Sequence, residues 1–254
     1  NEAGRNALGA AFFEALPQRL QELGEDPNIR VVLLAARGRD FSVGLDLGFL
    51  AEAMKQGAGE EEKAGVAHRL ALREEVMRIQ RAITSIEKCP KPVIALVQGY
   101  CLGGGLDVIT ACDFRLASSE AILSIRETRM AIVSDLGTLQ RLPALVSPGQ
   151  ARQLAYTGED ISAERAREIG LVNQVFATPE ELHEGGLSIA RKIVSNSPLA
   201  VQGSKAVLQY CQGKTVEDGL DYVATWNAAF IESEDLKEGV SAFFEKRSPK
   251  FKGR

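Results

Sequence analysis

The chain has 254 residues, of which 45% are hydrophobic and 25% charged. This composition is typical of a globular protein and excludes extensive disorder. Thirty Lys and Arg residues against 34 Asp and Glu residues give a net charge of −4, which argues against a general polyanion-binding protein. The longest apolar runs, Val31–Ala36 and Val93–Val97, are far shorter than the about 20 residues of a membrane span. We therefore expect a water-soluble protein with one large domain, or one domain and an appendage.

The four cysteines have no CxxC spacing, and only two histidines could join them in a metal site. This predicts neither a zinc site nor a disulfide framework, and it favours a reducing compartment such as the cytoplasm or an organelle matrix. No secretory signal is recognisable. Because the first residue is Asn1 and not Met, a targeting segment further upstream would not be visible.

Five apolar, β-branched segments predict buried strands. The region between the first two, Leu47–Lys88, has a helical composition, but its Gly-, Glu- and Lys-rich middle, Lys55–Lys63, predicts a mobile surface loop. Further helices are expected around the later strands. The predicted strands are Ile29–Ala36, Pro92–Gln98, Phe114–Ala117, Ile122–Ile125 and Leu171–Phe176, and the predicted helices are Gly104–Cys112, Pro148–Tyr156 and Ala163–Ile169.

No strand signal follows Thr178. A helix to about Val194 is predicted by its start, which has an N-cap at Thr178, a proline at the first helical position, Pro179, and a capping glutamate, Glu181. The chain is therefore expected to have an α/β body, residues 1–177, and an all-helical region, residues 178–254, that packs on the body or on a neighbouring subunit. The further helices predicted in this region are Pro198–Cys211, Val216–Ile231 and Ser233–Phe244.

Two glycine-containing segments follow predicted strands. The first is Phe41–Leu47, and the second contains three consecutive glycines, Gly103–Gly105, before a predicted helix. Free N–H groups at such a helix start face an incoming oxygen atom, but neither a Walker loop nor GxGxxG is present, so phosphate binding is not expected. A pair of N–H donors for an oxyanion, one from each segment, fits better. A tight turn in the first segment and close helix–strand packing in the second would explain the same residues.

Three acids are candidates for proton transfer. Asp107 lies in the first turn of a predicted helix, where the helix dipole favours a carboxylate whatever its function. Glu127 follows a predicted strand, and Asp135 precedes Gly137, where it is equally a candidate N-cap. We find no Ser/His/Asp set.

These segments resemble the crotonase (enoyl-CoA hydratase/isomerase) superfamily, in the family's order and over nearly the whole chain. The resemblance implies an α/β fold with a crotonase-type ββα spiral core that binds acyl-CoA thioesters, and a C-terminal helical region that forms trimers or dimers of trimers. The segments that carry it are Asn6–Leu8, Phe41–Leu47, Gly99–Asp113, Gly137–Pro143, Ala166–Val172 and the ending Phe251-Lys252.

The resemblance also implies which groups hold the substrate. The backbone N–H groups of Leu45 and Gly104 would bind the thioester oxygen, which carries the negative charge of an enolate, and one such donor is worth about 3–4 kcal/mol. Coenzyme A is then part of the substrate, so neither a separate cofactor nor a metal is implied. Further contacts with the substrate or with CoA are expected from Ser42, Val43, Asp46, Gly103, Phe251 and Lys252, the last two reaching a neighbouring subunit's CoA.

The acids indicate the subgroup. Enoyl-CoA hydratases carry two glutamates twenty positions apart; Asp107 and Glu127 have this spacing, but the shorter aspartate retracts its carboxylate by about 1.5 Å. Asp135 follows eight positions after Glu127, and the set Asp–Glu–Asp resembles Δ3,5-Δ2,4-dienoyl-CoA isomerases. We therefore predict an enzyme of fatty acid β-oxidation that converts 3,5-dienoyl-CoA to 2,4-dienoyl-CoA.

In the implied mechanism Asp135 or Glu127 removes a proton from C2, and the other acid protonates C6. By analogy with the family we assign Asp135 as the base and Glu127 as the acid, with Asp107 lining the pocket. One carboxyl must be ionised and the other protonated, which burial and mutual repulsion can achieve.

Other functions stay open. A hydratase would use Asp107 and Glu127 on a shared water, and a Δ3-Δ2-enoyl-CoA isomerase would need only one acid. A binding module without strong catalysis would need a basic stripe, but the arginines of residues 69–81 are interleaved with glutamates. A purely structural subunit would leave the three acids unexplained.

Overall fold

The computed structural model describes residues 2–49, 51 and 65–254, so the predicted loop Lys55–Lys63 lies outside the described residues. The chain divides into two compact units. The division falls inside helix α8 (Pro179–Val194), after Gly186 and not at Thr178. Unit 1 comprises Asn1–Glu22, Leu33–Cys89 and Val93–Gly186, and unit 2 comprises Leu23–Val32, Pro90–Pro92 and Leu187–Arg254.

The strands form a four-stranded and a three-stranded sheet in the described part of the chain. The first has the order β1-β2-β4-β7, in which β4 pairs in parallel with β2 and with β7. The second has the order β3-β5-β6, in which β5 pairs in parallel with β3 and antiparallel with β6. The strands are β1 (Val32–Ala35), β2 (Val93–Val97), β3 (Tyr100–Leu102), β4 (Phe114–Ser118), β5 (Ile122–Ser124), β6 (Ile161–Ser162) and β7 (Gln174–Phe176).

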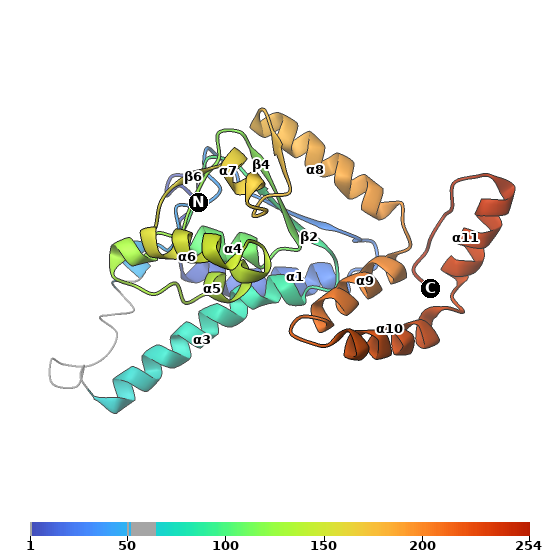
Figure 1. The fold of residues 1–254 in the computed structure, drawn as a ribbon, viewed down its shortest axis with the longest axis horizontal. Helices are drawn as coiled ribbons and strands as arrows, with labels where there is room; N and C mark the ends of the chain where they lie inside the picture. The colour runs from blue at the N-terminus through green and yellow to red at the C-terminus, as the bar shows by residue number, and fades with distance from the viewer. Residues whose placement is uncertain (1, 50, 52–64) are drawn as a thin grey trace. The chain divides into compact units, whose positions relative to one another are not determined.

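The core of unit 1 holds a short helix, α4 (Gly104–Thr110). All five residues of β2 are buried, which agrees with the uninterrupted apolar run Val-Ile-Ala-Leu-Val. α4 is buried along its whole length and packs against α3 (Val66–Lys88) and α5 (Thr138–Arg141), as Figure 1 shows. Ile83 and Ile86 of α3 are fully buried, as is Ile109 of α4. The remaining helices of this part of the chain are α1 (Ala10–Glu25), η2 (Glu127–Met130), η3 (Leu142–Ala144), α6 (Pro148–Thr157) and α7 (Ala163–Glu168).

A buried arginine fixes the C-terminal end of α4. Arg115 on β4 is 3% exposed, and its guanidinium donates to the carbonyls of Ile109 and Cys112 at 3.3 and 3.1 Å and to Leu171 O at 2.7 Å. Burial lowers the pKa of this guanidinium, while the carbonyl dipoles at a helix end favour a cation. This position of α4 determines where the acid in its first turn lies.

Most predicted elements of the body are confirmed, although the helix α1 was not predicted. Tyr100–Leu102, for which no strand was predicted, forms β3, which pairs with β5, and the Ser42 N–H donates to Tyr100 O at 2.9 Å. The short strand β6 was not predicted either. The strand predicted at Leu171–Phe176 is shorter, Gln174–Phe176.

Unit 2 is helical apart from its connecting segments and contains α9 (Pro198–Tyr210), α10 (Val216–Phe230) and α11 (Glu234–Glu245). α9 and α10 pack together, with the rings of Tyr210 and Tyr222 stacked at 4.1 Å. Large apolar side chains remain exposed on these helices, among them Leu208, Val216, Leu220, Phe243 and Phe244. No helix among the described residues is long and apolar enough to cross a bilayer.

Candidate active site

The loop Phe41–Asp46 lies between the N-terminal segment and β3. Leu45 bridges to Leu8, and Ser42 bridges to Cys101. Inside the loop, the Ser42 hydroxyl donates to Asn6 O at 2.8 Å and accepts from Gly44 N at 3.1 Å. Ser42, predicted to contact the substrate, is 2% exposed. The structure uses its hydroxyl to shape the loop.

Two backbone N–H groups meet at this loop without acceptors. A Cβ on Gly104 would lie 3.6 Å from Leu45 N, which brings the two predicted donors side by side. Leu45 N–H and Gly104 N–H donate to no group among the described residues, whereas the flanking N–H groups of Asp46 and Gly103 are bonded to Leu8 O and Ser124 O. Buried N–H groups are rarely left without an acceptor, so this pair is suited to an oxygen atom of a ligand.

Gly103 leaves space for the Glu127 carboxyl beside the two N–H donors. Its φ of 49° and ψ of −117° are a conformation that only glycine adopts readily. A Cβ at this position would lie 3.2 Å from Glu127 Oε1. The absence of a side chain therefore lets the Glu127 carboxyl approach the start of α4.

Glu127 is the first residue of η2, shortly after β5, and is half-buried. Within the described part of the chain its Oε2 is buried and has no hydrogen-bond partner. Burial raises the pKa of this carboxyl, and the charge of Asp135 raises it further. Both effects favour the protonated form of the carboxyl, which is the form that can act as an acid.

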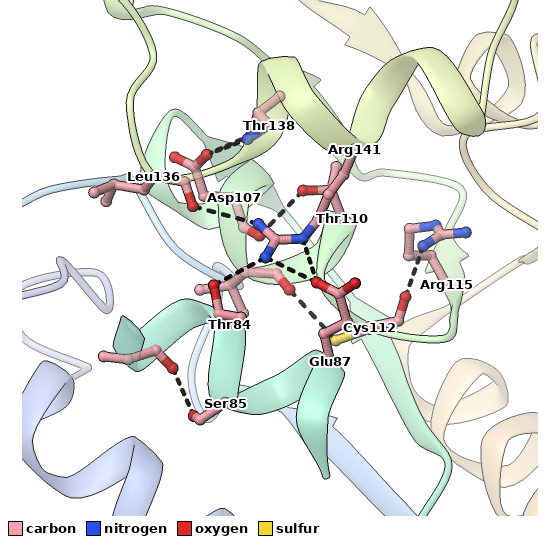
Figure 2. A network of polar contacts seen from close by, with 12 residues as sticks. Thr84, Ser85, Glu87, Asp107, Thr110, Cys112, Arg115, Leu136, Thr138 and Arg141 are labelled. Carbon is pink, nitrogen blue, oxygen red and sulfur yellow. Dashed lines mark hydrogen bonds and ion pairs between the residues drawn. The ribbon is translucent and has the colours of Figure 1, made fainter. Parts of the chain in front are cut away.

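Asp107 is held by a residue far along the sequence. It is 1% exposed, and its Oδ1 accepts from both the N–H and the hydroxyl of Thr138, each at 2.7 Å. Figure 2 shows the two side chains facing each other across α4 and α5. Asp107 thus serves as the N-cap of α5 from another element, since Gly137 at the cap position offers no side chain. Burial raises the pKa of Asp107 to about 7, with smaller contributions from the charges of Glu127 and Asp135.

Asp135 lies in the segment that leads to α5. It is exposed, and its backbone carbonyl accepts from Gln80 Nε2 at 2.6 Å. Partial burial raises the pKa of its carboxyl. The alternative of an N-cap is wrong, because α5 begins at Thr138 with Gly137 at the cap position. Asp135 therefore does not cap α5. The charge of Asp135 acts on both Glu127 and Asp107, so the three acids lie close enough to influence one another.

Replacing Asp107 with asparagine should change how stability depends on pH. The folded chain holds the Asp107 proton to about pH 7, whereas an unfolded chain loses it near the ordinary value of 3.8. Stability is therefore lost as the pH rises from about 4 through 7. The asparagine side chain keeps an oxygen acceptor for Thr138 and has no proton to lose, so the Asp107→Asn variant should gain in Tm relative to the unchanged protein over this range.

The size of this gain follows from the pKa difference. Each pKa unit is worth about 1.4 kcal/mol, and each kcal/mol about 2–4 °C in Tm, so a gain of several °C is expected at pH 8. Calorimetry at a series of pH values checks it. Glu22→Gln, on the exposed face of α1, is the control. A Tm difference independent of pH would contradict the prediction.

The other predicted contact residues make hydrogen bonds within the chain. Val43 N donates to Arg5 O at 3.2 Å, and Asp46 Oδ1 accepts from Gly48 N at 2.7 Å, as a helix cap does. Phe251 and Lys252 belong to unit 2, where Arg30 Nη2 donates to Phe251 O and Lys252 N donates to Asp235 Oδ1. Among the described residues no group of three His, Cys, Asp or Glu side chains could hold a metal ion.

Three residues of the site were not predicted: Thr138, Arg141 and Gln80. Thr138 and Arg141 belong to a segment that the family resemblance singled out, but nothing in the sequence pairs Thr138 with Asp107. Gln80 occupies one position of a long helix and carried no signal at all.

The comparisons with known proteins agree with this geometry. The family model described as "Enoyl-CoA hydratase/isomerase" matches residues 1–254. The chain belongs to this family. A relative from Arabidopsis thaliana, named Delta(3,5)-Delta(2,4)-dienoyl-CoA isomerase, peroxisomal, is 46% identical over 246 residues, which cover 97% of this chain and 88% of the relative. A mitochondrial protein of the same name from Dictyostelium discoideum is 43% identical, with 97% and 83% covered.

Solved structures of the enoyl-CoA hydratase/isomerase family have the same fold. The structure of an enoyl-CoA hydratase from Bacillus anthracis matches with a TM-score of 0.88 and 37% identity, covering 100% of this chain and 93% of the other. A putative enoyl-CoA hydratase from Streptomyces coelicolor also gives a TM-score of 0.88, at 28% identity. The predicted α/β crotonase fold is thereby confirmed.

Proposed function

We propose that this family member converts 3,5-dienoyl-CoA to 2,4-dienoyl-CoA in fatty acid β-oxidation. The observation that carries the proposal is a third carboxyl, Asp135, whose charge acts on Glu127 beside two N–H donors that have no acceptor in the described part of the chain. A hydratase needs only two carboxyls around a water. Relatives at 46% and 43% identity carry the name of this isomerase, and their peroxisomal and mitochondrial names favour an organelle matrix as the compartment.

The N–H groups of Leu45 and Gly104 would donate to the thioester oxygen. When the C2 proton leaves, negative charge moves to this oxygen, and donors fixed in advance stabilise it. Because the dienolate is conjugated, the charge is shared as far as C6. Protonation there gives the 2,4-diene, so that one proton is removed and one is returned.

The surroundings of the two acids fit opposite roles. Asp135 is exposed and tolerates a negative charge, which suits the base. Glu127 has a buried oxygen without a partner among the described residues, which favours the protonated form and suits the acid. Asp107 feels the charges of both acids, and its Oδ1 is occupied as the acceptor for Thr138. This use of Asp107 disfavours the hydratase alternative, in which the same carboxylate would hold a water.

The remaining substrate and subunit contacts belong to the same proposal. The thioester and CoA would be lined by the backbone of Ser42, Val43, Asp46 and Gly103. The side chains of Ser42 and Asp46 are already engaged in hydrogen bonds with nearby backbone groups. Phe251 and Lys252 would reach CoA in a trimer or a dimer of trimers. The exposed apolar side chains of α10 and α11 support burial against other subunits.

The experiment is a pair of rates on one preparation. Growth of the conjugated 2,4-dienoyl thioester from 3,5-dienoyl-CoA is followed by absorbance, beside hydration of 2-enoyl-CoA. Fast conjugation with slow hydration is expected. Fast hydration without conjugation would overturn the proposal in favour of a hydratase with Asp107 and Glu127, and no turnover of either substrate, together with salt-sensitive polyanion binding, would favour a binding module.

A further inference from the structure

Residues of α3, α4 and α5 bind the segment Asp135–Thr138 at three of its four residues. Asp135 O accepts from Gln80 of α3 at 2.6 Å, and Leu136 O accepts from Arg141 Nη1 at 3.4 Å. Thr138 is bound to Asp107 of α4. A segment without regular structure is thus fixed against both α3 and α4, and the carboxyl of Asp135 is placed by these contacts.

Arg141 is the member of this set that connects most partners. Its Nε donates to Glu87 Oε2 at 2.9 Å, Nη2 lies 2.9 Å from the same oxygen, and Nη2 also donates to Thr84 Oγ1 at 3.1 Å. Figure 2 shows the guanidinium between these two α3 residues and Leu136. The Arg141 side chain is 18% exposed and that of Glu87 is 32% exposed, so the pair is more sheltered than the surface ion pairs, which contribute little.

Gly137 provides a second, independent sign that the guanidinium supports this segment. Its φ is 123°, and a Cβ there would lie 1.8 Å from Arg141 Nη1. The backbone therefore passes directly against the guanidinium, at a residue that has no side chain to keep it away. Arg141 fills this space with a flat group that donates to the adjacent carbonyl.

We propose that Arg141, held by Glu87 and Thr84, is a positioning residue that fixes the Asp135 carboxyl relative to Glu127 for proton transfer. The inference rests on the proposed isomerase function. Arg141 bonds to the backbone of the segment and to α3, and it acts on the reaction only through Asp135. Its loss loosens the base without removing any group that binds the thioester, so kcat should fall while KM stays the same.

The test compares Arg141→Ala, Arg141→Lys and Glu87→Gln with the unchanged protein on 3,5-dienoyl-CoA. Arg141→Ala should lower kcat about 10- to 100-fold, with KM within about twofold, and ethylguanidinium in the assay should restore part of kcat. Arg141→Lys cannot reach Glu87, Thr84 and Leu136 with one ammonium, so it should recover only part of the rate. Glu87→Gln, which keeps an acceptor but loses the charge, should lower kcat several-fold.

Arg167→Ala removes an exposed ion pair with Glu164 on α7 and serves as the matched control with unchanged kcat. An Arg141→Ala variant with full kcat, or one whose lower activity follows loss of folded protein and is not restored by ethylguanidinium, would overturn the inference. If Arg141→Ala does not fold, full kcat in Arg141→Lys and Glu87→Gln overturns it instead. The isomerase activity of the unchanged protein is measured before any variant is compared. If this activity is absent, the proposed function is overturned and the inference with it.

Discussion

An Asp135→Asn variant should lose isomerase activity by about 10²- to 10⁴-fold, the usual contribution of a general base. Asparagine has nearly the same shape and keeps the backbone carbonyl that Gln80 binds, so the segment should stay in place. What is lost is the ability to take up a proton. The measurement is kcat on 3,5-dienoyl-CoA, with KM expected to change little.

The pH dependence of the unchanged protein gives the same prediction a second readout. The base must be ionised to react, and burial raises the pKa of Asp135 above its ordinary value of 3.8. The rate should therefore fall as the pH drops through that raised pKa, and the residual activity of Asp135→Asn should lack this step. Asp26→Asn, in a turn of unit 2, is the matched control with unchanged activity. Full activity in Asp135→Asn would exclude Asp135 as the base.

Gly103→Ala should lower kcat by about 10²- to 10³-fold, because one methyl group disturbs two parts of the site. The φ of 49° with ψ of −117° at this residue is unfavourable for alanine, so the backbone before the Gly104 N–H must move. The new Cβ would also lie 3.2 Å from Glu127 Oε1 and displace that carboxyl. Measured kcat and KM, with circular dichroism to confirm folding, test this prediction.

Gly149→Ala is the matched control for this substitution. Gly149 lies in the first turn of α6, and a Cβ there would meet no atom within 4 Å. Alanine in a helix should raise stability by about 0.5–1 kcal/mol and leave kcat unchanged. Equal activity of the Gly103→Ala and Gly149→Ala variants would show that Gly103 has no special place in the site.

The sequence predicted the parts of the fold that depend on local pattern. The apolar run of β2, the glycines before α4 and the Thr178 cap of α8 each carry their own signal, and the Thr178 hydroxyl does accept from Glu181 N at 3.2 Å. β3 carries no such signal, since it is a strand only through its pairing with β5 and its bridge to the Ser42 loop, both distant in sequence. Long-range pairing of this kind leaves no mark in the spacing of nearby residues.

The same distinction holds for the candidate site. Asp107, Glu127 and Asp135 were predicted from their spacing and from family resemblance, and the structure brings their charges within mutual influence. The roles of Asp107 and of its partner Thr138 could not be predicted, because the contact joins two helices separated by 31 positions. Asp135, the acid nearest to α5 in sequence, was the candidate N-cap, whereas the structure supplies the cap from α4.

This remote cap has a consequence for how the family's activities can change into one another. A glutamate at position 107 would restore the pair of glutamates typical of the hydratases, but the added methylene would push its oxygen into Thr138, which lies 2.7 Å from the present carboxylate. The displaced helix start would carry Asp135 with it. We therefore expect an exchange of one activity for the other to need changes in residues 135–138 together with position 107.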